Sequence, residues 1–183
     1  MRVIAGKYKR RPLSCPRGQT IRPVPDRLKE SLFSILQPWL EQAKVLDLCA
    51  GTGAMGIEAL SRGAAWVTFV DSWETAIQTL RQNLTACGVD SGYDILPRDV
   101  RVALTRLARM EETFDFIFFD PPYASDLYQP VLEALGQGEL LRPRGLVLVM
   151  HHAKNRLQET YGKLRRWREL KQGENILSFY ILD

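Results

Sequence analysis

The sequence predicts an α/β fold in which a mostly parallel sheet carries helices on both faces. Beyond Pro38, short apolar runs alternate with helical patterns, which is the order produced by strands joined through crossover helices. One run, residues 114–119, is rich in phenylalanine and stops at Pro121 and Pro122, which cannot continue a central strand. Another run, 45–48, stops at a glycine turn. Open α/β sheets bind ligands at such strand ends, so we expect the functional site there.

The first 40 residues are predicted to form an extension to this core. Residues 2–13 hold two short alternating runs around Gly6 and Lys7, which predict a small basic hairpin. The proline-rich residues 14–25 predict an irregular connector. Asp26 is a candidate N-cap for a helix that runs to about Pro38. The apolar side of this helix contains Leu28, Leu32, Phe33, Ile35 and Leu36.

The core elements follow one another in strict alternation. Strands are expected at residues 45–48, 66–70, 93–96, 114–119 and 146–150, and helices at 55–61, 74–87, 100–110 and 127–135. Residues 163–170 and 175–182 alternate well enough to predict a closing hairpin across Gly173. Neither a repeat nor a second-domain linker is visible. We therefore expect a single domain over residues 1–183, with an extension at 1–40 and a catalytic core at 41–183.

Composition excludes several classes of protein. The chain has 183 residues, of which 45% are hydrophobic and 25% charged, which is ordinary for a soluble globular protein with a real core. Its apolar stretches are shorter than the roughly 20 residues that a membrane span needs, and its N-terminus lacks a signal-peptide pattern. Cys15, Cys49 and Cys87 are widely spaced and odd in number, which favours a reducing compartment and neither a disulfide framework nor a zinc site. Cys49 and Cys87 are expected to be small packing residues. We expect a cytoplasmic protein without a metal site.

Charge is concentrated at the two ends of the chain. Residues 1–30 hold nine Lys or Arg against two acids, and residues 142–183 hold nine against four. The stretch between them holds seven Lys or Arg against fifteen acids. With a pI near 9.1, this pattern favours a polyanionic partner that the ends hold, although a solvated face without a partner explains it equally well.

A candidate cofactor site lies in the glycine turn after the first core strand. Gly51-x-Gly53-x-x-Gly56 lets the backbone approach a ligand and matches the dinucleotide fingerprint, a weak signal by itself. Asp47, inside the strand end, has no part in a pyrophosphate site. Its carboxylate can instead receive the ammonium group of S-adenosylmethionine, directly or through water. We therefore predict S-adenosylmethionine as the cofactor.

Two further acids follow the next strands. Asp71 comes twenty residues after Gly51 and can accept hydrogen bonds from both ribose hydroxyls, in NAD and in S-adenosylmethionine alike. Asp99 can accept from the adenine amine or cap the helix at 100–110. In the context of the other acids we favour the adenine contact.

Asp120-Pro121-Pro122-Tyr123 is the candidate chemical site. The exocyclic amine of a nucleobase is a poor nucleophile because its lone pair is delocalised into the ring. The Asp120 carboxylate and the Pro121 carbonyl are placed to accept the two amine hydrogens and to aim the nitrogen at a sulfonium methyl group. Tyr123 can stack on a target base that has left its own stack. The alternative is a tight loop without chemistry, which we consider the weaker interpretation.

Motifs similar to those of one known family occur along nearly the whole chain. They are Arg2-Val3-Ile4-Ala5-Gly6-Lys7-Tyr8-Lys9, then Arg22-Pro23-x-x-Asp26-Arg27-x-Lys29-Glu30-x-x-Phe33, the set Asp47, Gly51, Gly53 and Glu58, the tetrapeptide Asp120 to Tyr123, and Gly173-x-x-x-Leu177-Ser178-Phe179-Tyr180. On these residues, the chain resembles the bacterial enzymes that methylate N2 of guanine 966 in 16S rRNA. Val24 departs from the family's usual threonine, and Asp71 from its common glutamate.

The resemblance implies a Rossmann-like class I methyltransferase with a seven-stranded, mostly parallel sheet. It also implies S-adenosylmethionine as methyl donor and 16S rRNA of the small ribosomal subunit as partner; we expect a monomer that needs neither membrane nor metal. Phosphate contacts are predicted for Arg2, Lys7, Lys9, Arg10, Arg11, Arg22 and Arg27.

Other functions stay open on the sequence alone. Asp-Pro-Pro-Tyr also occurs in DNA adenine and protein glutamine methyltransferases, so an adenine-N6 or other amine methyltransferase is the nearest alternative. An NAD-linked oxidoreductase and a non-catalytic RNA-binding module are alternatives from other classes. His151 and His152 are expected in a loop after a strand. The basic residues 163–171, with Trp167 among them, could touch RNA or form a solvated strand face.

Overall fold

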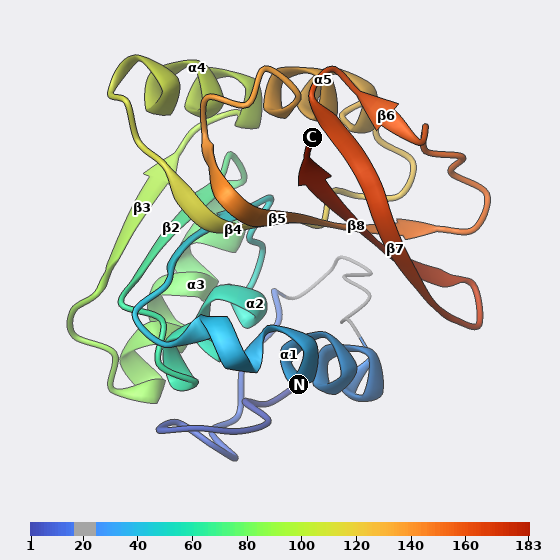
Figure 1. Ribbon diagram of the computed structural model, residues 1–183. Coiled ribbons are helices and arrows are strands. Elements are labelled where there is room, and N and C mark those ends of the chain that lie inside the picture. Colours follow the sequence, from blue (N-terminus) through green and yellow to red (C-terminus); the bar gives the residue numbers. More distant parts are fainter. Residues whose placement is uncertain (17–24) are drawn as a thin grey trace.

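The computed structural model describes residues 1–16 and 25–183. In this part of the chain, eight strands form one sheet in the order β3-β2-β1-β4-β5-β8-β7-β6, with helices above and below it (Figure 1). The first five strands run parallel, whereas β8, β7 and β6 are paired antiparallel. The strands are β1 Lys44–Leu48, β2 Trp66–Asp71, β3 Tyr93–Pro97, β4 Phe114–Phe119, β5 Leu141–His152, β6 Thr160–Tyr161, β7 Leu164–Gln172 and β8 Asn175–Leu182.

The helices cover the two faces of the sheet unequally. On one face lie α1 Asp26–Leu40, α2 Ala54–Ser61 and α3 Glu74–Cys87, and on the other lie α4 Val100–Arg109 and α5 Tyr128–Leu135 (Figure 1). Alternate residues of a strand point to opposite faces. Phe116 and Phe118 of β4 accordingly pack in the first layer, and Ile117 and Phe119 in the second. Burial on both faces explains why β4 is apolar almost throughout.

The predicted α/β fold and the closing hairpin, now β7 and β8, are confirmed, and most elements end within two residues of the predicted bounds. The count of seven strands was wrong by one, because the two-residue β6 pairs with the start of β7. The prediction of a loop at His151 and His152 was also wrong. Both belong to β5, and the side chain of His151 is buried at the junction with β8.

Helix α1 differs from the prediction at both ends. Asp26 is its first residue and not its N-cap, a position that Pro25 takes without a side-chain hydrogen bond. The helix continues through Pro38 to Leu40, although a proline inside a helix removes one backbone hydrogen bond. Leu36 and Leu40 are completely buried one turn apart, so burial of this apolar stripe holds the last turn in place.

The N-terminal segment doubles back on itself as predicted, although its only strand-like pairing within the described residues is the antiparallel bridge between Arg2 and Pro12. The reversal at Gly6 is docked on the end of α2, where the amide of Lys7 donates to the carbonyl of Ser61 at 2.7 Å. A Cβ atom on Gly6 would lie 1.7 Å from that carbonyl oxygen, and φ at this position is +81°. Only glycine fits this contact.

Most of the predicted connector at 14–25, together with Arg22 and Val24, lies outside the described residues. Ser14 is described, and it exchanges hydrogen bonds with the side chain of Asn83 on α3. Within the described ranges, no helix combines the length and the apolar character needed to cross a membrane.

Gly56 brings α2 unusually close to β2. A Cβ atom there would lie 2.2 Å from Cε1 of Phe69 and 2.7 Å from Cγ1 of Val67. Alanine normally stabilises a helix relative to glycine. At this position we expect the steric clash to outweigh that gain, so Gly56→Ala should destabilise the protein by about 1–3 kcal/mol. Urea unfolding measures this change, with Gln78→Ala on the exposed side of α3 as the control. An unchanged or higher midpoint for Gly56→Ala would contradict the close packing.

Candidate active site

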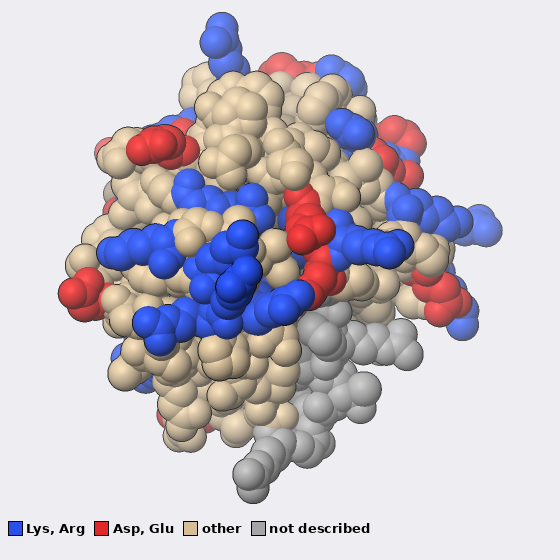
Figure 2. All heavy atoms as spheres, turned by 90° about the horizontal axis from the view of Figure 1, so that it is seen from below, with Lys and Arg blue, Asp and Glu red and all other residues tan. Residues whose placement is uncertain are grey.

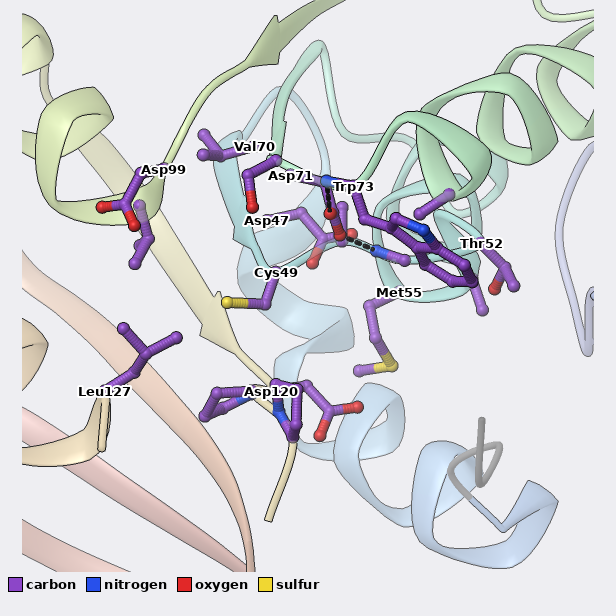
Figure 3. A pocket seen from close by; sticks show the side chains of 18 of the residues that line it. Asp47, Cys49, Thr52, Met55, Val70, Asp71, Trp73, Asp99, Asp120 and Leu127 are labelled. Atoms are coloured by element: carbon purple, nitrogen blue, oxygen red, sulfur yellow. Dashed lines mark hydrogen bonds between the residues drawn. The ribbon is translucent and has the colours of Figure 1, made fainter. Parts of the chain in front are cut away.

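A cavity of about 670 Å³ opens at the carboxyl ends of the parallel strands (Figure 3). Four acids reach it from four successive strand ends, as the sequence predicted: Asp47 in β1, Asp71 at the end of β2, Asp99 after β3 and Asp120 after β4. In Figure 3, Asp47 and Asp71 lie on one side of the cavity and Asp120 on the other. The parallel register explains this arrangement, because Asp47 pairs with Phe69 of β2 and with Phe118 of β4. Asp71 and Asp120 each follow two residues after these partners, at the same edge of the sheet.

Asp47 is the most enclosed of these acids. Its side chain is 2% exposed, and one oxygen accepts a hydrogen bond of 2.9 Å from the amide of Gly56. Burial raises the pKa of this carboxyl well above its usual range, the Gly56 bond opposes the rise, and the charges of Asp120 and Asp71 add to it. A positively charged ligand would stabilise the ionised carboxylate against burial and against repulsion by the neighbouring acids.

Asp71 holds the glycine turn together. One of its oxygens accepts from the amide of Gly51 at 2.8 Å and the other from the amide of Trp73 at 2.9 Å, as the dashed lines in Figure 3 show. A carboxylate oxygen has room for a second hydrogen bond, so both remain able to accept from a ligand. Gly53, predicted to contact the cofactor, is not among the lining residues. It is the N-cap of α2, and its φ of +76° is a backbone conformation that glycine adopts readily.

Asp99 lies where it can both cap α4 and contact a ligand, the two roles that the sequence left open. Its side chain caps α4 by accepting from the amide of Arg101, and it forms an ion pair of 2.9 Å with the Arg101 guanidinium. These hydrogen bonds from Arg101 lower the pKa of Asp99. The residue also lines the cavity, so capping and a ligand contact are compatible.

Asp120 follows β4 directly and faces the cavity. Burial raises its pKa to about 7, far above the ordinary value of 3.8. Pro121 and Pro122 also line the cavity, and Pro121 is buried. A carboxylate that is poorly solvated and open to a ligand on one side is suited to accept hydrogen bonds from that ligand.

Tyr123 completes the lining on the Asp120 side. Its hydroxyl donates to Oδ1 of Asn175 at 2.8 Å, and its backbone carbonyl accepts from Nδ2 of Asn155 at 2.8 Å. The ring packs against that of His152, with 5.7 Å between the centroids. The sequence did not indicate Asn155 or Asn175, because asparagine is common in turns and beside them, and these two lie in the turn after β5 and directly after the turn between β7 and β8.

The sequence also missed several lining residues. Met1 reaches the cavity and lies next to Thr52, with 4.0 Å between its sulfur and the hydroxyl oxygen. Cys49 lines the cavity in a left-handed conformation with φ of 58°, and burial raises the pKa of its thiol, so it is a neutral lining group. Arg98 is the only lysine or arginine among the lining residues in the described ranges.

The predicted RNA-contacting cations that are described all have exposed side chains. They are Arg2, Lys7, Lys9, Arg10, Arg11 and Arg27. Figure 2 shows Lys and Arg side chains gathered on the lower face of the molecule, where Figure 1 places the N-terminal segment and α1. Since Met1 lines the cavity, this basic segment begins at the edge of the candidate site. Arg22 lies outside the described residues.

Comparison with known proteins agrees with this arrangement. Residues 1–181 match the protein family described as "Conserved hypothetical protein 95". The chain belongs to this family. YlbH of Bacillus subtilis, provisionally named as an rRNA methyltransferase, is 36% identical over 180 residues, which are 98% of each chain. Ribosomal RNA small subunit methyltransferase D of Escherichia coli K12 is 29% identical over 180 residues, or 98% of this chain and 89% of that protein.

Solved structures resemble this member of the Conserved hypothetical protein 95 family over its whole length. The Escherichia coli protein yhhF, provisionally described as a methyltransferase, has a TM-score of 0.87 and 28% identity, and the match covers 100% of this chain and 98% of that one. The fold is therefore that of the class I methyltransferases, as the sequence predicted.

Proposed function

We propose that the protein transfers a methyl group from S-adenosylmethionine to the exocyclic N2 of guanine 966 in 16S rRNA. The observation that carries the proposal is the juxtaposition, in one cavity, of the buried acid Asp47 with Asp120 and Tyr123. The names of the relatives, which refer to small-subunit rRNA methylation, support the choice of substrate.

The charge of the cavity favours S-adenosylmethionine over NAD. Four carboxylates face one guanidinium among the described lining residues, and the pKa of Asp47 is raised by burial and by its acidic neighbours. S-adenosylmethionine carries positive charge on its ammonium and sulfonium groups, whereas the pyrophosphate of NAD is anionic and would be repelled. Asp47 would hold the ammonium group, Asp71 the ribose hydroxyls and Asp99 the adenine amine, with Gly51 allowing close approach.

Asp120, Pro121 and Tyr123 would act on the target base. When bound, the cofactor supplies an electrophilic methyl group on sulfur. The Asp120 carboxylate and the Pro121 carbonyl accept the two hydrogens of the guanine amine and orient its nitrogen toward that methyl group. Tyr123 stacks on the base. A strong base is unnecessary, because the methylated ammonium product loses its proton readily.

The N-terminal extension would hold the RNA. In our proposal residues 1–40 contact phosphates through Arg2, Lys7, Lys9, Arg10 and Arg11, with Arg22 and Arg27, and residues 41–183 form the catalytic core of one domain. A non-catalytic RNA-binding module is the weaker alternative. Buried carboxylates such as Asp47 are costly to fold, and a simple RNA-binding protein would gain nothing from them.

Methyl transfer to purified small subunits tests the proposal. Tritiated S-adenosylmethionine should label subunits from cells that lack this gene, and mass mapping should place N2-methylguanine at position 966. Subunits that already carry the modification and duplex DNA are the controls, and both should stay unlabelled. Label in DNA or at another nucleotide would contradict the substrate. Titration with S-adenosylhomocysteine and with NADH separates the two cofactor classes, and preferential binding of NADH would contradict methyl transfer.

A further inference from the structure

The loop after β4 has little backbone support of its own. Pro121 and Pro122 have no N–H group to donate. The amide of Asp120 makes a long hydrogen bond of 3.4 Å to the carbonyl of Leu48, and the amide of Ser125 closes a turn onto the carbonyl of Pro122 at 2.9 Å. A loop that must present two acceptors and a ring in a defined geometry needs further anchors.

Two asparagines from distant parts of the chain provide such anchors. Asn155, in the turn after β5, donates from Nδ2 to the backbone carbonyl of Tyr123, and Asn175, the first residue of β8, accepts from the Tyr123 hydroxyl. Both distances are 2.8 Å. One asparagine therefore holds the backbone of Tyr123, and the other holds the far end of its ring.

Asn155 is itself held by the sheet. Its amide donates to the carbonyl of His152 at 2.8 Å, and its carbonyl lies 3.0 Å from Nδ1 of His151. Because Nδ1 of His151 faces only backbone carbonyls, of Asn155 and of His152, this nitrogen must carry the proton. The other ring nitrogen lies 2.9 Å from the hydroxyl of Ser178 on β8. The turn at Asn155 is thus tied to two strands through a buried histidine.

Asn175 is placed by the register of the antiparallel strands. It pairs with His152 of β5 and with Gln172 of β7. The ring of His152 packs against the ring of Tyr123 from the same position in the sheet. The plane of the Tyr123 ring is therefore set by a hydrogen bond at its tip and by a ring contact at its side.

We propose that Asn155 and Asn175 are positioning residues for methyl transfer. Asn155 holds the backbone that carries the Pro121 acceptor and Tyr123, and Asn175 sets the plane on which the target base stacks. Neither residue touches the base or the cofactor; each acts through Tyr123. This inference rests on the proposed function, because it assigns the two residues to the presentation of the amine.

Asn155→Ala and Asn175→Ala in the full-length protein test the inference. Each should lower kcat on small subunits by about 10- to 100-fold, as expected for a misplaced acceptor group, and leave the affinity for S-adenosylhomocysteine nearly unchanged. Amide hydrogen exchange of the peptide covering residues 120–127 should become faster in Asn155→Ala. Gln172→Ala, opposite Asn175 in the same hairpin, is the control. It should change neither kcat nor the exchange rate of this peptide.

Conservative variants separate positioning from a general loss of structure. Asn175→Asp keeps an acceptor for the Tyr123 hydroxyl and should restore most of the activity. Tyr123→Phe should lower kcat about as much as Asn175→Ala, and the double variant should be no worse than either one, because both changes remove the same hydrogen bond. Additive losses in the double variant, or unchanged exchange and kcat in Asn155→Ala, would overturn the inference. Wild-type protein that fails to label small subunits would instead overturn the proposed function, and the exchange measurement would still decide whether Asn155 holds the loop.

Discussion

Asp120→Asn should abolish methyl transfer and, at the same time, stabilise the protein above pH 7. The amide carries no charge and has a donor NH2 in place of one oxygen, so it is a much weaker acceptor for the amine hydrogen that we assign to the Asp120 carboxylate. We expect a loss of at least about 100-fold in kcat, which is the size of effect seen when one electrostatic contact to a transition state is removed. Affinity for S-adenosylhomocysteine should stay nearly intact, because Asp120 is assigned to the amine and not to the cofactor.

The gain in stability follows from the raised pKa of Asp120. The folded protein keeps this proton until about pH 7, whereas the unfolded chain releases it near the ordinary value of 3.8. Between these values the folded state binds more protons, so the contribution of Asp120 to stability falls as the pH rises through this window. Above pH 7 the ionised group costs about 2 to 4 kcal/mol, which asparagine would recover.

Urea unfolding of wild type and Asp120→Asn at pH 5 and pH 8, without cofactor, measures this difference. The stability advantage of the variant should be larger at pH 8 than at pH 5. Asp126→Asn, an exposed acid in the same loop, is the control and should show little effect at either pH. An active Asp120→Asn enzyme would contradict the role in methyl transfer, and an advantage independent of pH would contradict the raised pKa.

Glu58→Ala should be among the most destabilising single changes in the chain. Glu58 of α2 is completely buried, and its carboxylate lies 2.7 Å from Nε of Arg62 and 3.4 Å from Nζ of the buried Lys29. It also accepts hydrogen bonds from the amides of Ile4 and Ala5 in the N-terminal segment. Removing it leaves buried positive charge and two amides without their partner, which costs about 3–5 kcal/mol.

Release of the N-terminal segment should accompany this loss. Because Glu58 accepts from the amides of residues 4 and 5, its loss should loosen the backbone of the segment. Trypsin should then cleave faster after the basic residues 7–11, whose side chains are already exposed, at urea concentrations where the core stays folded. Glu58→Gln, which keeps the shape and one acceptor oxygen, should lie between the two proteins. Glu30→Ala on the exposed side of α1 is the control. Unchanged cleavage in Glu58→Ala would show that other contacts hold the segment.

Much of the candidate site could be predicted from local patterns. Asp47, Asp71, Asp99 and Asp120 each end or follow an apolar run, and parallel strands bring their carboxyl ends to one edge of the sheet. The glycine turn and the proline stop are equally local, because they depend on backbone conformations that few residues allow. Helix α1 could not be bounded in this way, since its last turn depends on the burial of Leu40 against other elements.

The sequence by itself therefore determined the fold class, the edge of the sheet that carries the site and the acids that line it, because periodicity and chain-breaking residues act over a few positions. The tertiary structure alone decided what Glu58, Asn155 and Asn175 do. The resemblance assigned Glu58 to the motif of the cofactor loop and the following helix, where it lies, but gave no partners for it. Apart from Arg62, those partners are more than 25 residues away, in the N-terminal segment and α1. Asn175 meets Tyr123 only because β8 pairs with β5 in one register. Such contacts depend on how distant segments pack, and a linear pattern of residue types carries no signal of that packing.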